Sequence, residues 1–409
     1  MEITLKNMNF YLFEKLNELL ENGIFEKRKV ILFGINSSSY CTKNYLEKKG
    51  IQVDAFIDND RKKCEEMNNA IDYVIKNHLD AESYHAIEKR LIRAYQPEEL
   101  LKDKLEDVVI LIASKYYSDM CRQLNAFGYE ENLQIFQTVN FYDLNHILDI
   151  AEVSKDMHEI EVREIKKIQL QLLRKLKQAC EENHLRYYLC GGTLLGAVRH
   201  KGYIPWDDDI DVAMPLEDYK NLIRILQKDE SYMTLSVYTH ADSYYNFFMK
   251  MIDNSTLMKS WEYPFLLTSG VSIDIFPLFG LPNKKEDVEY FYHKIRRLNM
   301  DFIRSYIESV QEDKETKERR RKLQEEIIAM MEQYDFDQSK NIGYLLSKYK
   351  EKEIMKRSIY QDQLMLEFEK EKFAVASGYK EYLKILFKNY MELPPEKERY
   401  NTHNYKVFQ

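Results

Sequence analysis

Aspartates at alternate positions are the residues of this sequence whose spacing most directly indicates chemistry. Asp209 and Asp211 belong to the stretch YIPWDDDIDVAM at 203–214. Because alternate side chains of a β-strand point to the same face, we expect both carboxylates to project together. Carboxylates this close repel each other unless they are protonated or bridged by a cation. A hard divalent ion, Mg²⁺ or Mn²⁺, is the expected bridge because it prefers oxygen ligands.

A third aspartate lies in another apolar stretch, SIDIF at 272–276. Asp274 is flanked there by isoleucines, which is typical of a buried strand with one acid facing a site. A buried carboxylate without a partner is unfavourable, and joining the same metal site would remove that penalty. We therefore expect Asp209, Asp211 and Asp274 to bind one divalent ion, and we leave open which of them acts as a general base.

Two glycines stand shortly before the acidic stretch. Gly191 and Gly192 follow an expected strand at 186–189, and Thr193 precedes an expected short helix at 194–199. Glycines let a phosphate approach the main chain closely, a threonine can cap a helix, and a helix N-terminus attracts anions. The pattern predicts a phosphate-binding turn.

Cationic side chains near this turn could hold the same phosphate. Arg199 is followed by His200 and Lys201, and arginine is the best suited of the three to a bidentate grip on phosphate. Lys250 could reach a diphosphate, with an ordinary surface lysine as the equal alternative. An exposed acidic turn or a Ca²⁺ loop would explain the aspartate run alone, but the glycine and terminal glutamate of an EF-hand loop are missing. The whole set predicts metal-assisted phosphoryl transfer with Arg199 in a catalytic role.

A second glycine turn, near the start of the chain, also follows an expected strand and opens an expected helix. Gly34 begins it, Asn36 stands where a dinucleotide fingerprint has another glycine, and a serine such as Ser38 can cap the helix. Asp58 ends the next strand, roughly where a ribose-binding acid lies in dinucleotide folds. Three interpretations stay open: a domain without a bound cofactor, a nucleotide or nucleotide-sugar site formed by these four residues, and an NAD(P) site.

Apolar runs alternate with helical segments through residues 1–150. The expected strands lie at 30–33, 53–57, 91–92, 108–113 and 133–136, and the expected helices at 38–49, from 97 onward and at 117–127. Apolar strands alternating with helices predict a parallel sheet covered on both faces. We therefore expect residues 1–150 to form an α/β, Rossmann-like domain.

Residues 151–409 are expected to form a second domain. It opens with an amphipathic helix within 157–184, whose apolar face carries Ile165, Ile168, Leu172, Leu176 and Ala179. The stretch 186–280 is typical of an α+β fold, and we expect 283–390 to be mostly helical because it is rich in charged residues.

Composition limits the classes of protein to consider. The chain has 409 residues and a formal net charge of −8, which argues against a nucleic-acid partner. It contains no run of about 18 apolar residues, and its first residues do not have the pattern of a signal peptide. Its five cysteines form no C-x-x-C pair, so we expect no disulfide framework and a reducing, cytoplasmic location.

The stretch GGTLLGAVRHKGYIPWDDDIDVAMPLEDY at 191–219 resembles the LicD family, within the nucleotidyltransferase-like superfamily that also includes the fukutin-related proteins. The resemblance continues through MIDNST at 251–256 and GVSIDIFPLFG at 270–280, and resumes at 378–405. The strings FIDND and PEEL in the first domain resemble small Rossmann-like domains attached to bacterial sugar-modifying enzymes.

The resemblance implies a nucleotidyltransferase-fold catalytic domain with helical C-terminal additions. It implies transfer of a phospho-alcohol, such as phosphocholine, from a CDP-linked donor to a hydroxyl of a cell-surface glycan, such as lipopolysaccharide or teichoic acid, or of its lipid-linked precursor. By motif match, Asp209 and Asp211 are the metal-binding acids, Asp274 is the third carboxylate, and Gly192 and Thr193 belong to the phosphate-binding turn.

The C-terminal part departs from the family pattern. The stretch FAVAS at 373–377 lacks the usual prolines, and His403 alone stands where the family often has two histidines. His403 is a candidate substrate-binding residue, with a surface or packing histidine as the alternative. Trp206 has packing under the acidic stretch and stacking on a base or sugar as its two interpretations.

Two other functions stay open. One is a CTP-dependent nucleotidyltransferase that activates a phospho-alcohol, and the other is a non-catalytic partner protein that senses a nucleotide-sugar. Because no transmembrane segment is expected, a lipid-linked acceptor would require peripheral contact with the inner face of the membrane, or partner proteins.

Overall fold

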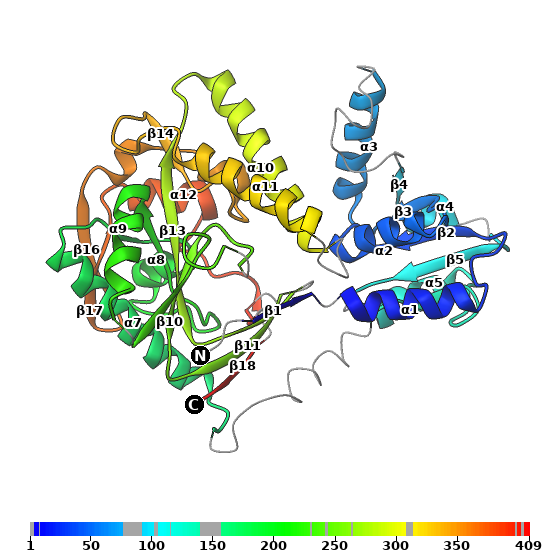
Figure 1. Ribbon diagram of the computed structural model, residues 1–409, viewed down its shortest axis with the longest axis horizontal. Coiled ribbons are helices and arrows are strands. Elements are labelled where there is room, and N and C mark those ends of the chain that lie inside the picture. Colours follow the sequence, from blue (N-terminus) through cyan, green and yellow to red (C-terminus); the bar gives the residue numbers. More distant parts are fainter. Residues whose placement is uncertain are drawn as a thin grey trace. The chain divides into compact units, whose positions relative to one another are not determined.

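The computed structural model describes two compact units, which are treated separately here (Figure 1). The larger unit comprises Met1–Lys6, Glu152–Glu262 and Leu266–Gln409, and the smaller comprises Asn7–Ala151 and Tyr263–Phe265. The described residues are 4–7, 9–76, 92–101, 105–114, 116–139, 157–229, 231–241, 244–262, 265–307, 314–396, 399–401 and 405–409.

A five-stranded parallel sheet forms the centre of the smaller unit. Its strands are β2 (Lys29–Phe33), β3 (Ala55–Ile57), β4 (Ala94–Tyr95), β5 (Val108–Ile112) and β6 (Ile135–Gln137). They lie in the order β4-β3-β2-β5-β6, and every neighbouring pair is parallel. Along the chain, β3 and β4 are thus added on one side of β2, and β5 and β6 are then added on its other side. This confirms the predicted parallel α/β sheet.

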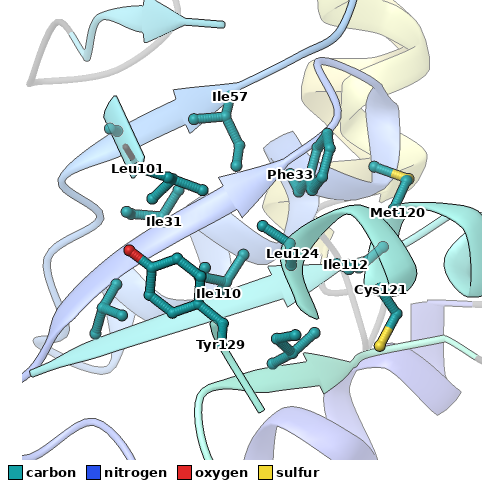
Figure 2. Close-up of a cluster of buried hydrophobic side chains, with 13 residues drawn as sticks. Ile31, Phe33, Ile57, Leu101, Ile110, Ile112, Met120, Cys121, Leu124 and Tyr129 are labelled. Carbon is teal, nitrogen blue, oxygen red and sulfur yellow. The ribbon is translucent and has the colours of Figure 1, made fainter. Parts of the chain in front are cut away.

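The helices of the smaller unit are α1 (Asn9–Glu21), α2 (Ser37–Lys48), α3 (Arg61–Lys76), α4 (Pro97–Leu101) and α5 (Tyr117–Ala126). Figure 2 shows one buried cluster, in which Ile31, Ile110 and Ile112 of the sheet meet Met120 and Leu124 of α5. All five residues of β5 are buried, which explains its unbroken apolar run, because a strand covered on both faces has no solvent-facing side.

A mixed sheet forms the centre of the larger unit. Its strands are β7 (Tyr188–Leu189), β8 (Asp211–Pro215), β9 (Tyr232–Leu235), β10 (Met249–Asp253), β13 (Ser272–Gly280), β14 (Asn341–Gly343) and β15 (Met355–Lys356). The long strand β13 is parallel to β8 and antiparallel to β10, and its last residues pair with β14. Strands β7 and β9 lie beyond β8 and β10, respectively, and β15 lies beyond β14.

The helices of this unit are α7 (Val162–Glu182), α8 (Gly191–Arg199), α9 (Leu216–Leu226), α10 (Lys285–Ile307), α11 (Lys314–Met331) and α12 (Tyr379–Phe387), with short 3₁₀ turns η1 (Lys350–Glu353) and η2 (Arg357–Tyr360). The expected apolar stripe of α7 is buried except at Ala179, which is half-buried next to the fully buried Cys180. Among the helices of the described residues, none is long and apolar enough to cross a membrane.

A second sheet of four strands has the order β1 (Thr4–Asn7), β12 (Phe265–Ser269), β11 (Leu257–Glu262) and β18 (Tyr405–Phe408). The first and last described strands of the chain therefore belong to the same sheet. The expected division near residue 150 would assign β1 to the first domain. In the structure, β1 precedes the smaller unit in the sequence but pairs with a strand of this second sheet.

The expectation that 283–390 is mostly helical is wrong after Met331. Residues 332–390, all of them described, contain four strands, and two of these, β16 (Gln363–Phe368) and β17 (Glu371–Ala376), form a hairpin. Its turn residues, Glu369 and Lys370, both have positive φ, as a tight hairpin turn requires. Asn-Gly is the usual sequence signal for such a turn, so a Glu-Lys turn in a charged stretch concealed the hairpin.

Candidate active site

Three charged side chains stand in one row across the central sheet of the larger unit. Asp211 of β8 is the register partner of Asp274 in β13, and Asp274 is the register partner of Lys250 in β10. Register partners on neighbouring strands carry their side chains on the same face. Two acids that are far apart in the sequence therefore lie on adjacent strands.

These acids line a cavity of about 360 Å³ together with Asp209. Gly191, at the start of α8, lies on the same side of the cavity, whereas Tyr349 and other residues of 344–353 contribute to its wall. The cavity thus combines acids from the sheet and its preceding loop with a wall that comes from segments after β14.

The predicted strand over 207–212 begins only at Asp211, so Asp209 reaches the cavity from the preceding loop rather than by strand alternation. The neighbouring Asp208 has a buried carboxylate that accepts hydrogen bonds from Asn401 and Tyr405. The carbonyl oxygen of Ile210 accepts a hydrogen bond of 2.9 Å from the N–H of Asp274 and so leads the loop into β8. The side chains of Asp209 and Asp211 nevertheless share one cavity.

Burial raises the pKa of the Asp211 carboxyl group well above its usual range, and the negative charges of Asp209 and Asp274 raise it further. The ammonium group of Lys348 acts in the opposite direction. No described residue donates a hydrogen bond to the Asp211 carboxylate. Buried, mutually repelling carboxylate oxygens of this kind fit a hard divalent cation such as Mg²⁺ or Mn²⁺.

Asp274 is engaged by Lys250, whose ammonium nitrogen lies 2.8 Å from Oδ1 and 3.0 Å from Oδ2. Lys250 is only 8% exposed, so it is not an ordinary surface lysine. Within the described ranges, no three His, Cys, Asp or Glu side chains are grouped so that they could hold a metal ion together. The metal-binding role expected for Asp209, Asp211 and Asp274 therefore stays a prediction.

The glycines lie inside helix α8, which begins at Gly191 rather than at the expected residue 194. Gly191 has a φ of +53°, and a Cβ atom there would lie 2.9 Å from Oδ2 of Asp211. A Cβ on Gly192 would lie 2.7 Å from Oδ2 of Asp207. A side chain at either position would therefore displace a carboxylate, and at Gly191 the positive φ also disfavours any other residue.

Thr193 does not cap helix α8, contrary to expectation. Its hydroxyl oxygen accepts a hydrogen bond of 2.8 Å from the N–H of Asp211 and so ties the helix to the acidic strand. The N-cap residue is Cys190, which makes no side-chain capping bond. The hydroxyl of Tyr382 instead accepts a hydrogen bond of 3.0 Å from the N–H of Gly191, so one main-chain donor at the positive end of α8 is satisfied by a residue of the cavity lining.

Arg199 lies at the other end of the same helix, and its guanidinium donates to the carbonyl oxygens of Tyr390 and Glu392 at 3.0 and 2.9 Å. Nine helical residues span about 13 Å, so the main chain of Arg199 lies far from Gly191, and Arg199 is not among the lining residues of the cavity. Among the described lining residues, the cation is Lys348. Sequence reasoning missed Lys348 because KYKEKE is typical of a solvated surface.

Glu353 is a second lining residue that the sequence did not reveal. Its side chain is 7% exposed and accepts a hydrogen bond of 3.2 Å from the hydroxyl of Ser347. Burial raises the pKa of Glu353 to about 7. The only sequence signal was an acid among lysines, which does not distinguish a buried carboxylate from an exposed one.

The glycine turn of the smaller unit is capped by its own residues. Gly34 has a φ of +102°, and the side-chain oxygen of Asn36 accepts a hydrogen bond of 3.0 Å from the N–H of Ser39. Asn36 therefore caps α2, a role that was expected of a serine. Ser38 is buried, and its carbonyl oxygen accepts a hydrogen bond from Thr42.

Asp58 stabilises that same turn. One carboxylate oxygen accepts a hydrogen bond of 2.7 Å from the N–H of Ile35, and the other accepts one of 2.8 Å from the N–H of Asp60. The ammonium group of Lys63 lies 3.8 Å away. The carboxylate expected to bind a ribose is thus already occupied by the main chain.

Trp206 is not among the lining residues of the cavity. Trp206 is half-buried, with the guanidinium of Arg399 5.7 Å from its ring centroid and the ring of His200 at 6.3 Å, which favours packing over base stacking. His403 lies outside the described residues.

Comparisons with known proteins identify the relatives of this chain. Residues 184–340 match the family model described as LicD/FKTN/FKRP, nucleotidyltransferase domain. The lipopolysaccharide cholinephosphotransferase LicD of Haemophilus influenzae is 30% identical over 261 residues, which cover 60% of this chain and 97% of that protein. The chain belongs to the LicD family. Membership confirms the predicted resemblance and the expectation of an enzyme that transfers a substituted phosphate group.

More distant LicD-family relatives share a shorter segment. The ribitol 5-phosphate transferases FKRP of mouse and human are each 57% identical over 37 residues, which cover 9% of this chain and 8% of those proteins. The stretch that matches the family model ends at residue 340, so Lys348, Tyr349 and Glu353 contribute to the cavity of this LicD-family chain from beyond it.

Proposed function

We propose that this LicD-family enzyme transfers a phospho-alcohol, phosphocholine or a related group, from a CDP-linked donor to a hydroxyl of a cell-surface glycan or its lipid-linked precursor. The observation that carries the proposal is the cavity lined by Asp209, Asp211 and Asp274, the last of which is paired with Lys250. The named activities of the relatives, choline-phosphate and ribitol 5-phosphate transfer, support the class of group transferred.

Asp209 and Asp211 would hold the divalent ion, Mg²⁺ or Mn²⁺, in this proposal. When bound, such an ion neutralises charge on diphosphate oxygens and on the leaving group. The fit rests on the two cavity-facing carboxylates and on the raised pKa of Asp211, both of which favour a cation with oxygen ligands.

The residues of this chain then have separate tasks. Lys348 and the N-terminus of α8, where the N-cap residue makes no side-chain bond, bind the donor phosphates, since an ammonium group and main-chain N–H groups both favour anions. Asp274 is the proposed general base, and Lys250 fixes the orientation of its carboxylate. Because Asp274 is already paired with Lys250, the role of general base fits its contacts better than the role of a third metal ligand.

The proposed reaction is an in-line displacement at the β-phosphorus of the donor. The acceptor hydroxyl oxygen forms the new P–O bond, the bond between the β-phosphorus and the bridging oxygen breaks, and CMP leaves. The hydroxyl proton passes to Asp274. A lipid-linked acceptor would bring the enzyme to the inner face of the membrane by peripheral contact.

The finer fold assignments are also proposals. The strand order β4-β3-β2-β5-β6 supports a Rossmann-like smaller unit, and the family model supports a nucleotidyltransferase-type larger unit. A nucleotide or nucleotide-sugar would bind the smaller unit where β2 and β5 end, with Gly34 and Asn36 nearby. Because Asp58 is held by the main chain, it would not also bind the ribose.

The test is incubation of the purified full chain with a panel of CDP-linked alcohols, a glycan acceptor and Mg²⁺ or Mn²⁺. Mass spectrometry would follow both CMP and the modified glycan. Metal-dependent formation of both supports the proposal. Release of pyrophosphate from CTP would instead favour a nucleotidyltransferase, and binding of a nucleotide-sugar without turnover would favour a sensing partner.

A further inference from the structure

A buried glutamine joins the two segments that carry the acids. Gln169 of α7 is 5% exposed, and its side-chain nitrogen donates to the carbonyl oxygen of Asp208 at 2.9 Å and to that of Ser272 at 3.4 Å. Asp208 immediately precedes Asp209, and Ser272 lies two residues before Asp274. One amide group thus bridges the acidic loop and the start of β13.

The orientation of this amide is set by a third contact. The hydroxyl group of Tyr203 donates to the side-chain oxygen of Gln169 at 3.1 Å. Tyr203 also packs against Phe368 of the β16–β17 hairpin, with ring centroids 5.0 Å apart. The glutamine therefore has partners for both ends of its amide, as a buried polar group requires.

The acidic loop is held from its other side by the end of the chain. Asp208 is 3% exposed, and its Oδ2 atom accepts hydrogen bonds from the side-chain nitrogen of Asn401 at 2.5 Å and from the hydroxyl of Tyr405. Tyr405 begins β18, which pairs with β11. The main chain of Asp208 is thus bound by α7 and its side chain by the C-terminal strand.

We propose that Gln169 and Tyr405 are positioning residues that set the placement of Asp209 and Asp211 relative to Asp274. The inference rests on the proposed function, because it takes these acids to form the reaction site. Both positioning residues lie outside 184–340, the stretch that matches the family model. Partners that orient metal-binding groups commonly affect metal affinity strongly, although they do not touch the metal.

The test measures Mn²⁺ binding to the metal-free full chain by calorimetry, without any turnover. Gln169→Met keeps the side-chain length and removes the donor, and Tyr405→Phe removes only a hydroxyl. We expect each variant to bind Mn²⁺ about 10- to 100-fold more weakly than the wild type. Gln171→Met on the exposed face of α7 and Tyr400→Phe, at an exposed tyrosine, are matched controls that should bind as the wild type does.

The same measurement separates positioning from mere support of the fold. A residue that only stabilises the fold would lower the unfolding temperature and leave Mn²⁺ affinity unchanged at a temperature where every variant is folded. Wild-type affinity in both Gln169→Met and Tyr405→Phe would overturn this inference and leave the proposed function standing. Failure of the wild type to bind Mn²⁺ would overturn both.

Discussion

The two glycine turns of this chain occupy similar positions between a strand and a helix but have different environments. Each follows a strand, opens a helix and lies near an aspartate. In the smaller unit, Asn36 caps the helix and Asp58 accepts two main-chain hydrogen bonds. In the larger unit, the N-cap residue of α8 makes no side-chain bond, and the N–H of Gly191 donates to a side chain, the hydroxyl of Tyr382. No described residue donates a hydrogen bond to the carboxylate of Asp211, which faces a cavity.

This difference teaches that a turn of this kind can be closed or open. A closed turn uses its aspartate to satisfy its own N–H groups and gains stability from it. An open turn leaves the carboxylate and the helix N-terminus available to a ligand, at the expense of a buried charge. If this contrast holds, substitutions at the closed turn should lower stability, whereas substitutions at the open turn should lower activity.

The largest expected effect is on the two aspartates. Asp211→Asn should lower the transfer rate by at least about 10³-fold, because it removes a charge that the proposed transition state requires. Asp58→Asn should leave the rate unchanged and lower the stability of the smaller unit by roughly 1–3 kcal/mol. Rate assays and denaturant unfolding of both variants would check this, and equal loss of activity would remove the distinction between the turns.

A second effect concerns the buried carboxylate of the open site. The pKa of Glu353 in the folded chain is about 7, above its ordinary value of 4.5, so the folded state binds this proton more tightly than the unfolded state. Stability should therefore fall as pH rises from about 4.5 to about 7, by on the order of 3 kcal/mol. Glu353→Gln should abolish that dependence in denaturant unfolding from pH 4.5 to 8, whereas parallel curves would contradict the assignment.

The glycines themselves supply a third test. Gly191→Ala should lower the transfer rate by about 10²-fold, because its Cβ would lie 2.9 Å from Oδ2 of Asp211 and displace that carboxylate. Gly34→Ala should act on stability alone, by about 1–3 kcal/mol, since its φ of +102° disfavours a side chain. A Gly191→Ala variant with normal turnover would show that the acid tolerates displacement.

The smallest effect is expected at the rim of the open site. Lys348→Ala should raise the KM for the donor about 10-fold through loss of a charged contact with phosphate, and Lys348→Arg should largely restore it. Arg199→Ala should leave the KM unchanged, because its guanidinium holds the carbonyl oxygens of Tyr390 and Glu392. Steady-state kinetics with varied donor concentration would measure both values. An unchanged KM in Lys348→Ala and a raised KM in Arg199→Ala would assign phosphate binding to Arg199 instead.

Local patterns were sufficient to predict part of the molecule. The apolar runs at 30–33 and 108–113 became β2 and β5, because a strand buried on both faces needs no alternation. The convergence of Asp211 and Asp274 followed from two apolar segments that each carried one acid. The hairpin after Met331 was missed, because its turn has no glycine or asparagine.

The remaining site residues depend on contacts between distant segments. The hydroxyl of Thr193 accepts a hydrogen bond from the N–H of Asp211, and Arg199 donates to the carbonyl oxygens of Tyr390 and Glu392. Neither contact can be predicted from the local sequence. Gln169 is a related case. It lies on the apolar face of α7, which is consistent with an interior contact, but the local sequence does not show which groups it contacts. Tertiary structure decides which polar groups are satisfied and which remain available.

The origin of the cavity wall has a practical consequence. The main-chain positions of Asp211 and Asp274 are fixed by strand register. Tyr349 and Glu353, which also line the cavity, come from short connecting segments, which tolerate exchange better than strands do. Replacing residues 344–353 with the corresponding segment of another family member would thus be a way to change which donors the cavity accepts. The acids on β8 and β13 would stay unchanged.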